Sequence, residues 1–393
     1  MTPVTKKYLI PFMILLAAAS SGCRGDEIVI PTQVESVGEV IAGGPVDGFY
    51  LLNEGNMGSN KCTLDFYDYR LGTYSRNIYA ERNPGVVKEL GDVGNDLAIY
   101  RGRLYAVVNC SHKVEVTDAM TAVRIGQIDI PNCRHIIFND GMAYVSSYVG
   151  PVQISGDAPK GAVYEIDTST LQITRRVTVG YQPEEMVIAG GNLYVANSGG
   201  YRAPDYDHTV SVVDLKSFRQ TRQIQTAINL DRMRLDRYGK IWLTSRGDHG
   251  DVASCIQVLE ADQNGKYQLT TTLPYPCSNM TLKGDSLLYI STQWSDITQN
   301  NTISYGVIDI RDGIKITDNF ITDGSETDIM IPYGISSNPA SGDIYITDAK
   351  NYVSSGELRC YSSGGKLKWR VRTGDIPACI AFLTDENKTA VNP

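Results

Sequence analysis

The sequence repeats one pattern of four short strands. One copy starts at Met186 and reads MVIAGGNLYVAN, then TVSVVDLKSFRQTRQIQT after a link; others start at His135 and Leu97. Apolar and polar residues alternate in each strand, and Gly, Asp, Asn and Ser separate the strands. An aromatic residue recurs in the second strand of each copy, at Tyr50, Tyr105, Tyr144, Tyr194, Trp242, Tyr289 and Tyr345. Seven copies of roughly 40 to 55 residues predict seven four-stranded blades.

The two ends of this region complement each other. The first copy begins at GFYLLNEG (from Gly48) and lacks an innermost strand, whereas IPACIAFLT (Ile376 to Thr384) is a strand without a blade. Pairing them closes a ring and removes exposed sheet edges. We therefore predict an all-β fold, a seven-bladed β-propeller over residues 46–393, closed by the C-terminal strand pairing with the N-terminal blade. A pair of Greek-key sandwiches is the alternative, which the register of the repeat disfavours.

The N-terminus has the pattern of an export signal. MTPVTKKYLIPFMILLAAASSGC has a basic start and an apolar run from Tyr8 to Ala19, shorter than the about 20 residues of a spanning helix. SSGC resembles a bacterial lipobox, although Ser20 replaces the usual leucine. We predict a lipoprotein signal peptide over residues 1–22, lipidation of Cys23 and a lipidated tether over residues 23–45. An ordinary cleavage site followed by a spare cysteine is the alternative.

Acidic residues follow the cysteine in RGDE, which resembles the surface-export signal of Bacteroides-type lipoproteins. We therefore expect a cell-surface lipoprotein held in the outer membrane by its lipid anchor. The chain has a net charge of −8 and no basic stripe, which disfavours nucleic acid as a partner.

Two kinds of link are long, and both open on the same face of a propeller. Links from the second to the third strand include SYVGPVQISGDAPK and SGGYRAPDYDH, and blade-to-blade links also open there, whereas links on the opposite face, such as IAGGN, are tight. Function commonly lies on loops carried by a rigid scaffold, so we predict a binding site on this loop face. The candidate ligand-binding residues are Asn53, Asn56, Asn95, His112, Arg134, Tyr148, Tyr201, Arg202, Tyr206, Arg246, Trp294, Tyr333 and Tyr352.

Four cysteines occupy repeated positions. Cys110 ends a second strand and Cys133 starts the next innermost strand, and Cys255 and Cys277 repeat this arrangement. Because disulfides persist in exported proteins, we predict the pairs Cys110–Cys133 and Cys255–Cys277. Cys360 with Cys379 is a looser candidate pair, and Cys62 has no evident partner. No C-x-x-C motif is present and the histidines are scattered, so no metal site is predicted.

Signatures of catalysis are absent from the sequence. It contains no G-x-S-x-G, no H-E-x-x-H and no phosphate-binding glycine loop, so we predict no catalytic residue, no catalytic cofactor and no enzyme activity. His112, His208 and His249 fall on the loop face and leave a histidine-assisted lyase open.

The repeat from Gln182 to Ile224, with QPEEMVIAGGNLYVAN and TVSVVDLKSFRQTRQI, resembles that of the YncE-like propellers. The lipobox together with GFYLLNEGNMGSNKCTLDFYD (Gly48 to Asp68) resembles the BtuG-like cobalamin-binding surface lipoproteins. That resemblance implies a protein that captures cobalamin or other corrinoids and passes them to a BtuB-like TonB-dependent outer-membrane transporter. The alternatives are capture of a glycan or another nutrient and, from a different class, a streptogramin-lyase-like or lactonase-like enzyme, since propellers host many activities.

Overall fold

The computed structural model describes residues 31–41, 43–86, 89–295 and 299–389. The chain divides into two units, Met1–Pro31 and Thr32–Pro393, and the described residues lie almost entirely in the second. The predicted signal peptide and Cys23 lie outside the described residues. Within those residues, no helix is long and apolar enough to cross a membrane.

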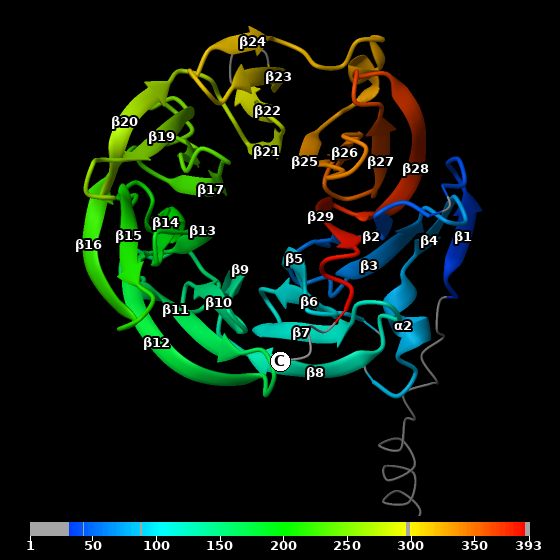
Figure 1. Cartoon of the computed structure of the whole chain (residues 1–393), viewed down its shortest axis with the longest axis horizontal. Helices are drawn as coiled ribbons and strands as arrows, with labels where there is room; N and C mark the ends of the chain where they lie inside the picture. The colour runs from blue at the N-terminus through cyan, green and yellow to red at the C-terminus, as the bar shows by residue number, and fades with distance from the viewer. Residues whose placement is uncertain (1–30, 42, 87–88, 296–298, 390–393) are drawn as a thin grey trace, which may run out of the picture. The chain divides into compact units, whose positions relative to one another are not determined.

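The second unit contains seven antiparallel sheets arranged as blades around a centre (Figure 1). In each blade the first strand lies nearest the centre and the fourth lies at the outer wall. Contacts join every inner strand to the next, in the order β29, β5, β9, β13, β17, β21, β25 and back to β29. This arrangement confirms the seven-bladed propeller.

The first three blades, with their strands in order from the centre outwards, are built as follows. Blade one contains β29 (Pro377–Thr384), β2 (Val46–Asn53), β3 (Thr63–Asp68), β4 (Thr73–Arg76) and β1 (Gln33–Ser36). Blade two contains β5 (Gly94–Tyr100), β6 (Arg103–Val108), β7 (Lys113–Asp118) and β8 (Arg124–Asp129). Blade three contains β9 (Cys133–Asn139), β10 (Met142–Ser147), β11 (Lys160–Asp167) and β12 (Gln172–Tyr181).

The remaining blades follow the same order. Blade four contains β13 (Pro183–Ala189), β14 (Asn192–Asn197), β15 (Thr209–Asp214) and β16 (Arg219–Gln225). Blade five contains β17 (Leu230–Leu235), β18 (Ile241–Ser245), β19 (Cys255–Ala261) and β20 (Tyr267–Leu273). Blade six contains β21 (Asn279–Lys283), β22 (Ser286–Ser295), β23 (Asn300–Asp309) and β24 (Lys315–Thr317). Blade seven contains β25 (Pro332–Ser337), β26 (Ile344–Asp348), β27 (Ser355–Tyr361) and β28 (Leu367–Asp375). Among the described residues, three short helices lie in links: α2 (Ile78–Arg82), η1 (Gly200–Arg202) and η2 (Ser325–Asp328).

Blade one is closed by the two ends of the propeller. β29 pairs antiparallel with β2, with Tyr50 opposite Ala381, as the sequence predicts. On the other side of this blade, β1 pairs with β4 as a fifth strand. The prediction of a tether over residues 23–45 is therefore wrong for Gln33–Ser36, because the outer edge of β4 accepts these residues as a strand. The pairing is reinforced by an ion pair of 2.9 Å between Glu35 and Arg76.

The recurring aromatic residue of the second strand is part of the core. Trp242, Tyr105, Tyr194, Tyr289 and Tyr345 are each almost completely buried. The Tyr50 hydroxyl donates to the Ala119 carbonyl in blade two at 2.8 Å, whereas the Tyr105 hydroxyl is buried without a hydrogen-bond partner among the described residues. Burial of these rings between neighbouring blades explains why the position recurs in every repeat.

Candidate functional site

The site is built from pairs of consecutive residues near the start of four inner strands. Four neighbouring blades place charged or amide side chains there: Asn95 and Asp96, Arg134 and His135, Glu184 and Glu185, and Asp231 and Arg232. Because inner strands run away from the blade-to-blade links, these pairs lie at the loop-face end of the central channel.

A β-bulge recurs at this position. In β13, Pro183 lies opposite Asn197 and Met186 opposite Val195, so the inner strand has one residue more than its partner. The register shifts at the equivalent point in blades one, two, three, five and seven. A regular strand points successive side chains to opposite faces, whereas a bulge re-aims them. The bulges thereby allow two polar side chains per blade to meet near the centre.

Glu184 is the centre of the resulting ion cluster. Its side chain is fully buried, and its Oε2 lies 3.0 Å from Arg134 Nε and 3.6 Å from His135 Nε2. Its Oε1 lies 3.3 Å from Arg246 Nη1 and accepts a hydrogen bond from the Tyr148 hydroxyl. Burial alone would raise the pKa of Glu184, but the two guanidinium groups and His135 outweigh it and hold the pKa well below the usual range.

His135 is a fixed cation in this cluster. It is buried, and its Nδ1 lies 3.3 Å from Asp96 Oδ2. Burial would lower the pKa of His135, but its contacts with Asp96 and Glu184 outweigh burial and raise the pKa to about 9. The imidazole is therefore protonated at neutral pH, with both nitrogens facing carboxylates.

The cluster continues into blade five. Arg232 Nη1 lies 3.1 Å from Glu185 Oε1, and Arg246 Nη2 lies 2.7 Å from Asp231 Oδ1. Arg234 also pairs with Glu185. Burial opposes ionisation of Glu185, but the guanidinium groups lower its pKa to about 2. The charges at the channel entrance are thus held in place by one another.

Glu54 differs from the other carboxyl groups at the channel entrance. No described cation lies within ion-pair distance of it, and both of its oxygens accept from the Tyr333 hydroxyl at 2.9 Å. Burial raises its pKa to about 7, against the opposing effect of Tyr333. This contact joins blade one to blade seven.

A pocket of about 460 Å³ opens beside the cluster between blades five, six and seven. Its polar wall includes Arg232 and Arg246, and its aromatic wall consists of Trp294, Tyr333 and Tyr352. Trp294 is 59% exposed and Tyr352 is 40% exposed, and the Tyr333 and Tyr352 rings meet edge to face at 6.0 Å. This volume is within the range of small-molecule sites. His249, which is exposed, also lines the pocket.

The structure gathers eight of the predicted ligand-binding residues into two groups. Arg246, Trp294, Tyr333 and Tyr352 line the pocket, and Asn95, Arg134, Tyr148 and Tyr201 lie around the Glu184 side of the cluster. In the second group Arg134 donates to Asn95 Oδ1 at 2.9 Å, and Tyr148 meets Tyr201 edge to face at 4.8 Å. Tyr148 is buried, so its hydroxyl is used inside the protein rather than presented to a ligand.

The other predicted residues make local contacts instead. Asn53 is fully buried and donates to Thr63 Oγ1 at 3.1 Å, so the prediction that it contacts ligand is wrong. The Asn56 carbonyl holds a turn by accepting from the Ser59 backbone at 2.9 Å, and His112 Nδ1 accepts from the Asn132 backbone at 2.9 Å. Arg202 lies over the Tyr181 ring at 3.8 Å. Tyr206 is half-buried, and its backbone N–H donates to the Pro204 carbonyl.

The two predicted disulfides are not present in the structure, where all four cysteines are free. The Cys133 thiol is buried and donates to the Lys113 carbonyl at 3.3 Å, whereas the Cys110 thiol is directed to Asn109. Cys277 is likewise buried and donates to the Asn279 carbonyl at 3.4 Å, while Cys255 is half-exposed. Cys62, Cys360 and Cys379 are also free.

Sequence reasoning missed the acidic residues of the site, its histidine and one of its arginines, namely Glu54, Asp96, Glu184, Glu185, Asp231, His135 and Arg232. The signal was available, because aligning the repeats places ND, RH, EE and DR at one position of four successive blades. Among the residues that the structure describes, no group of His, Cys, Asp and Glu is arranged to hold a metal ion.

Fold and site together define a seven-bladed β-propeller with an ion cluster at its channel entrance and an aromatic pocket beside it. The family described as Domain of unknown function (DUF5074) matches residues 47–368, and the chain belongs to this family. None of the curated proteins matches the sequence.

Solved propellers are similar in fold. A quinonprotein alcohol dehydrogenase-like protein from Bacteroides thetaiotaomicron is 16% identical, with a TM-score of 0.58 over 87% of this chain and 80% of that chain. A hypothetical selenium-binding protein from Sulfolobus tokodaii is 10% identical, with a TM-score of 0.62 over 90% and 97%. The periplasmic gluconolactonase of Pseudomonas aeruginosa is 13% identical, with a TM-score of 0.60 over 86% and 99%. At these identities the likeness concerns the fold alone.

Proposed function

We propose that this protein captures cobalamin or another corrinoid on its loop face and passes it to a BtuB-like TonB-dependent transporter without catalysing a reaction. The observation that carries the proposal is the pocket with Trp294, Tyr333 and Tyr352 on one wall and arginines on the other. A corrin is a broad flat ring fringed by amides, with one phosphate in its nucleotide loop. Aromatic faces and hydroxyl groups suit the ring and its amides, and a guanidinium group suits the phosphate.

The buried His135 cannot serve as the base of a histidine-assisted reaction, so such a reaction in the pocket would have to use the exposed His249. A general base needs a free lone pair near neutral pH. His135 has carboxylates at both ring nitrogens and a pKa of about 9, so it is cationic there. The ion cluster also fixes Arg232 and Arg246 before a ligand arrives, which lowers the entropic cost of binding.

The choice of corrinoid over other flat ligands follows from the resemblance of Gly48 to Asp68 to the BtuG-like lipoproteins. The same proposal includes a lipid anchor at Cys23 and a location at the outer surface of the outer membrane. A protein in that position would meet the nutrient before the transporter does.

Cyanocobalamin binding tests the proposal. Added to the purified protein, it should form a red complex that survives gel filtration and gives a heat signal on titration. Trp294→Ala and Tyr352→Ala should each weaken binding by about tenfold, since each removes an aromatic contact at the centre of the site. Tyr238→Ala is the matched control, because Tyr238 is 52% exposed but lies in a tight link of the opposite face.

Three results would contradict the proposal. The first is a failure of the coloured complex to persist. The second is that the protein binds a member of a glycan panel but not cyanocobalamin, and that Trp294→Ala and Tyr352→Ala abolish the glycan binding. This result would assign the pocket to glycan capture. The third is turnover of a lactone or streptogramin substrate that depends on His249, which would make the pocket an active site.

A further inference from the structure

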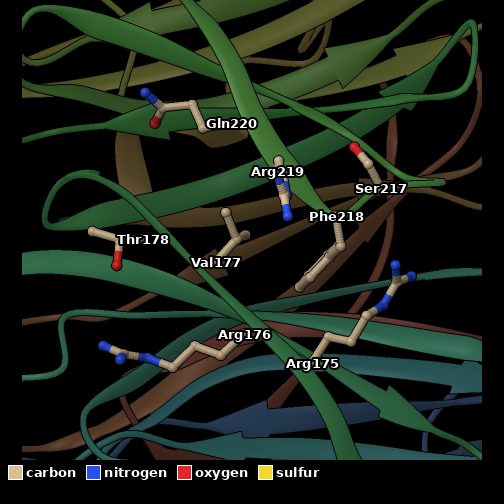
Figure 2. Close-up of a pocket in the computed structure, with 8 residues that line it drawn as sticks. All are labelled: Arg175, Arg176, Val177, Thr178, Ser217, Phe218, Arg219 and Gln220. Atoms are coloured by element: carbon tan, nitrogen blue, oxygen red, sulfur yellow. The ribbon is translucent and has the colours of Figure 1, made fainter.

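A basic groove of about 500 Å³ crosses the outer wall between blades three and four (Figure 2). β12 forms one side, and β16 with the turn before it forms the other. Its lining contains three arginines and no acidic residue. Figure 2 shows the side chains of Val177 and Phe218 in the space between the two strands, where they give the groove an apolar floor.

Two of the three arginines have no carboxylate partner. Arg175 is neutralised by Glu165, with Nε 2.7 Å from Oε1, and its guanidinium lies over the Phe218 ring. Arg176 and Arg219 are exposed, and neither forms an ion pair with a described residue; Arg176 lies near the Tyr164 ring at 5.6 Å. Neither β12 nor β16 contains an acidic residue, although the chain has a net charge of −8. The groove is therefore a local cationic surface on an acidic protein.

The strands beside the groove also have an open edge. Among the described strands, β12 pairs only with β11 and β16 only with β15. β12 is ten residues long. The outer edge of such a strand presents unpaired N–H and C=O groups that can template another strand.

Blade one shows what an outer edge of this propeller can accept. There the outermost strand of the four, β4, pairs antiparallel with β1. Glu35 of the added strand places its carboxylate 2.9 Å from Arg76 of β4. Backbone pairing and a glutamate–arginine contact thus occur together at an edge of this same chain.

We infer that the edge of β12 is a docking site for an extended acidic segment of a partner protein. The segment would add to β12 as a strand, as β1 adds to β4, with its carboxylates on Arg176 and Arg219. Main-chain hydrogen bonds supply the affinity of such strand addition, and side-chain contacts supply the preference. The inference concerns the outer wall and is independent of the ligand bound on the loop face.

Fluorescence polarisation with a labelled peptide that alternates glutamate and threonine tests this inference. The peptide should bind the purified protein, and N-methylation of alternate amides should abolish binding because it removes the donors of the added strand. The double variant Arg176→Glu/Arg219→Glu should bind at least about tenfold more weakly, since attraction becomes repulsion. Arg237→Glu/Arg311→Glu changes the net charge equally at exposed links of the opposite face and should bind normally.

Several results would overturn the inference. Equal binding of the N-methylated peptide would show simple charge attraction rather than strand addition. The protein could bind dextran sulfate but not the peptide, and Arg176→Glu/Arg219→Glu could abolish the binding of dextran sulfate. That result would assign the groove to anionic polysaccharides. The Arg176→Glu/Arg219→Glu variant could also bind the peptide as strongly as the unmodified protein does and self-associate in sedimentation experiments. That result would mean that the two arginines only keep the open edges of neighbouring protein molecules apart. Thermal melting confirms that each variant is folded.

Discussion

Replacing Glu184 by glutamine tests whether the ion cluster holds the centre of the propeller together. The carboxylate is fully buried and lies within ion-pair distance of Arg134, His135 and Arg246. Glutamine keeps the size and one acceptor oxygen, but it leaves the buried His135 and the partly buried Arg134 and Arg246 without their shared anion. Removing one partner of a buried ion pair costs about 3–5 kcal/mol. We expect a loss of this size in the free energy of unfolding.

Urea unfolding followed by tryptophan fluorescence measures this loss. The unfolding entropy is about 2 cal/mol/K per residue, so in a chain of this size each kcal/mol lowers the melting temperature by only about 1.3 °C. The expected decrease in melting temperature is therefore about 4–7 °C. Asp318→Asn is the control, because Asp318 is 88% exposed in its pair with Lys315 and should change stability by less than about 1 kcal/mol.

A double-mutant cycle with Arg134→Met separates the ion pair from general damage. If Glu184 compensates Arg134, then Glu184→Gln should be less costly in the Arg134→Met background. A loss below about 1 kcal/mol for Glu184→Gln alone, or strictly additive losses in the cycle, would refute a shared electrostatic cluster.

Two other predictions concern buried groups. Burial raises the pKa of Glu54 to about 7, above about 4.5 in the unfolded chain, so its ionisation removes stability as the pH rises between these values. Glu54→Gln should be nearly neutral in urea unfolding near pH 4 and stabilising by about 2–3 kcal/mol at pH 8; an effect independent of pH contradicts this prediction. In native protein, iodoacetamide should modify the half-exposed Cys110 and Cys255 but not Cys62, Cys133, Cys277 or Cys360, which are buried. Mass spectrometry after denaturation without reductant should show all of these thiols alkylated, and masses that retain disulfides would contradict the free thiols.

The repeat predicts the blades, their order and the closing strand, because burial of Tyr105, Trp242 and their equivalents imposes the same pattern on every copy. The long links also predict which face carries the pocket. The acidic half of the ion cluster was missed because Glu184 and Glu185, read singly, are ordinary polar link residues. Only the bulge in β13 brings them to the centre, and a bulge has no signature in one copy of the repeat.

The burial of Asn53 could not be predicted either. The sequence of an asparagine at the end of a strand is the same whether its amide binds Thr63 or a ligand. The disulfide prediction failed for a related reason. Spacing along the chain places Cys110 and Cys133 at the same end of neighbouring blades, but the direction of each thiol depends on local packing.

The pairing of β29 with β2 determines when the ring of blades can close. These strands come from opposite ends of the propeller, so the pairing has a very large sequence separation and forms only after the last blade has been synthesised. Tyr333 and Glu54 meet across this same seam. A chain interrupted before Pro377 would retain six complete sheets yet lack the inner strand of blade one and its contacts with β5 and β25. The growing chain is therefore an unfinished ring, and blade one gains its inner strand only when the C-terminal strand has been made.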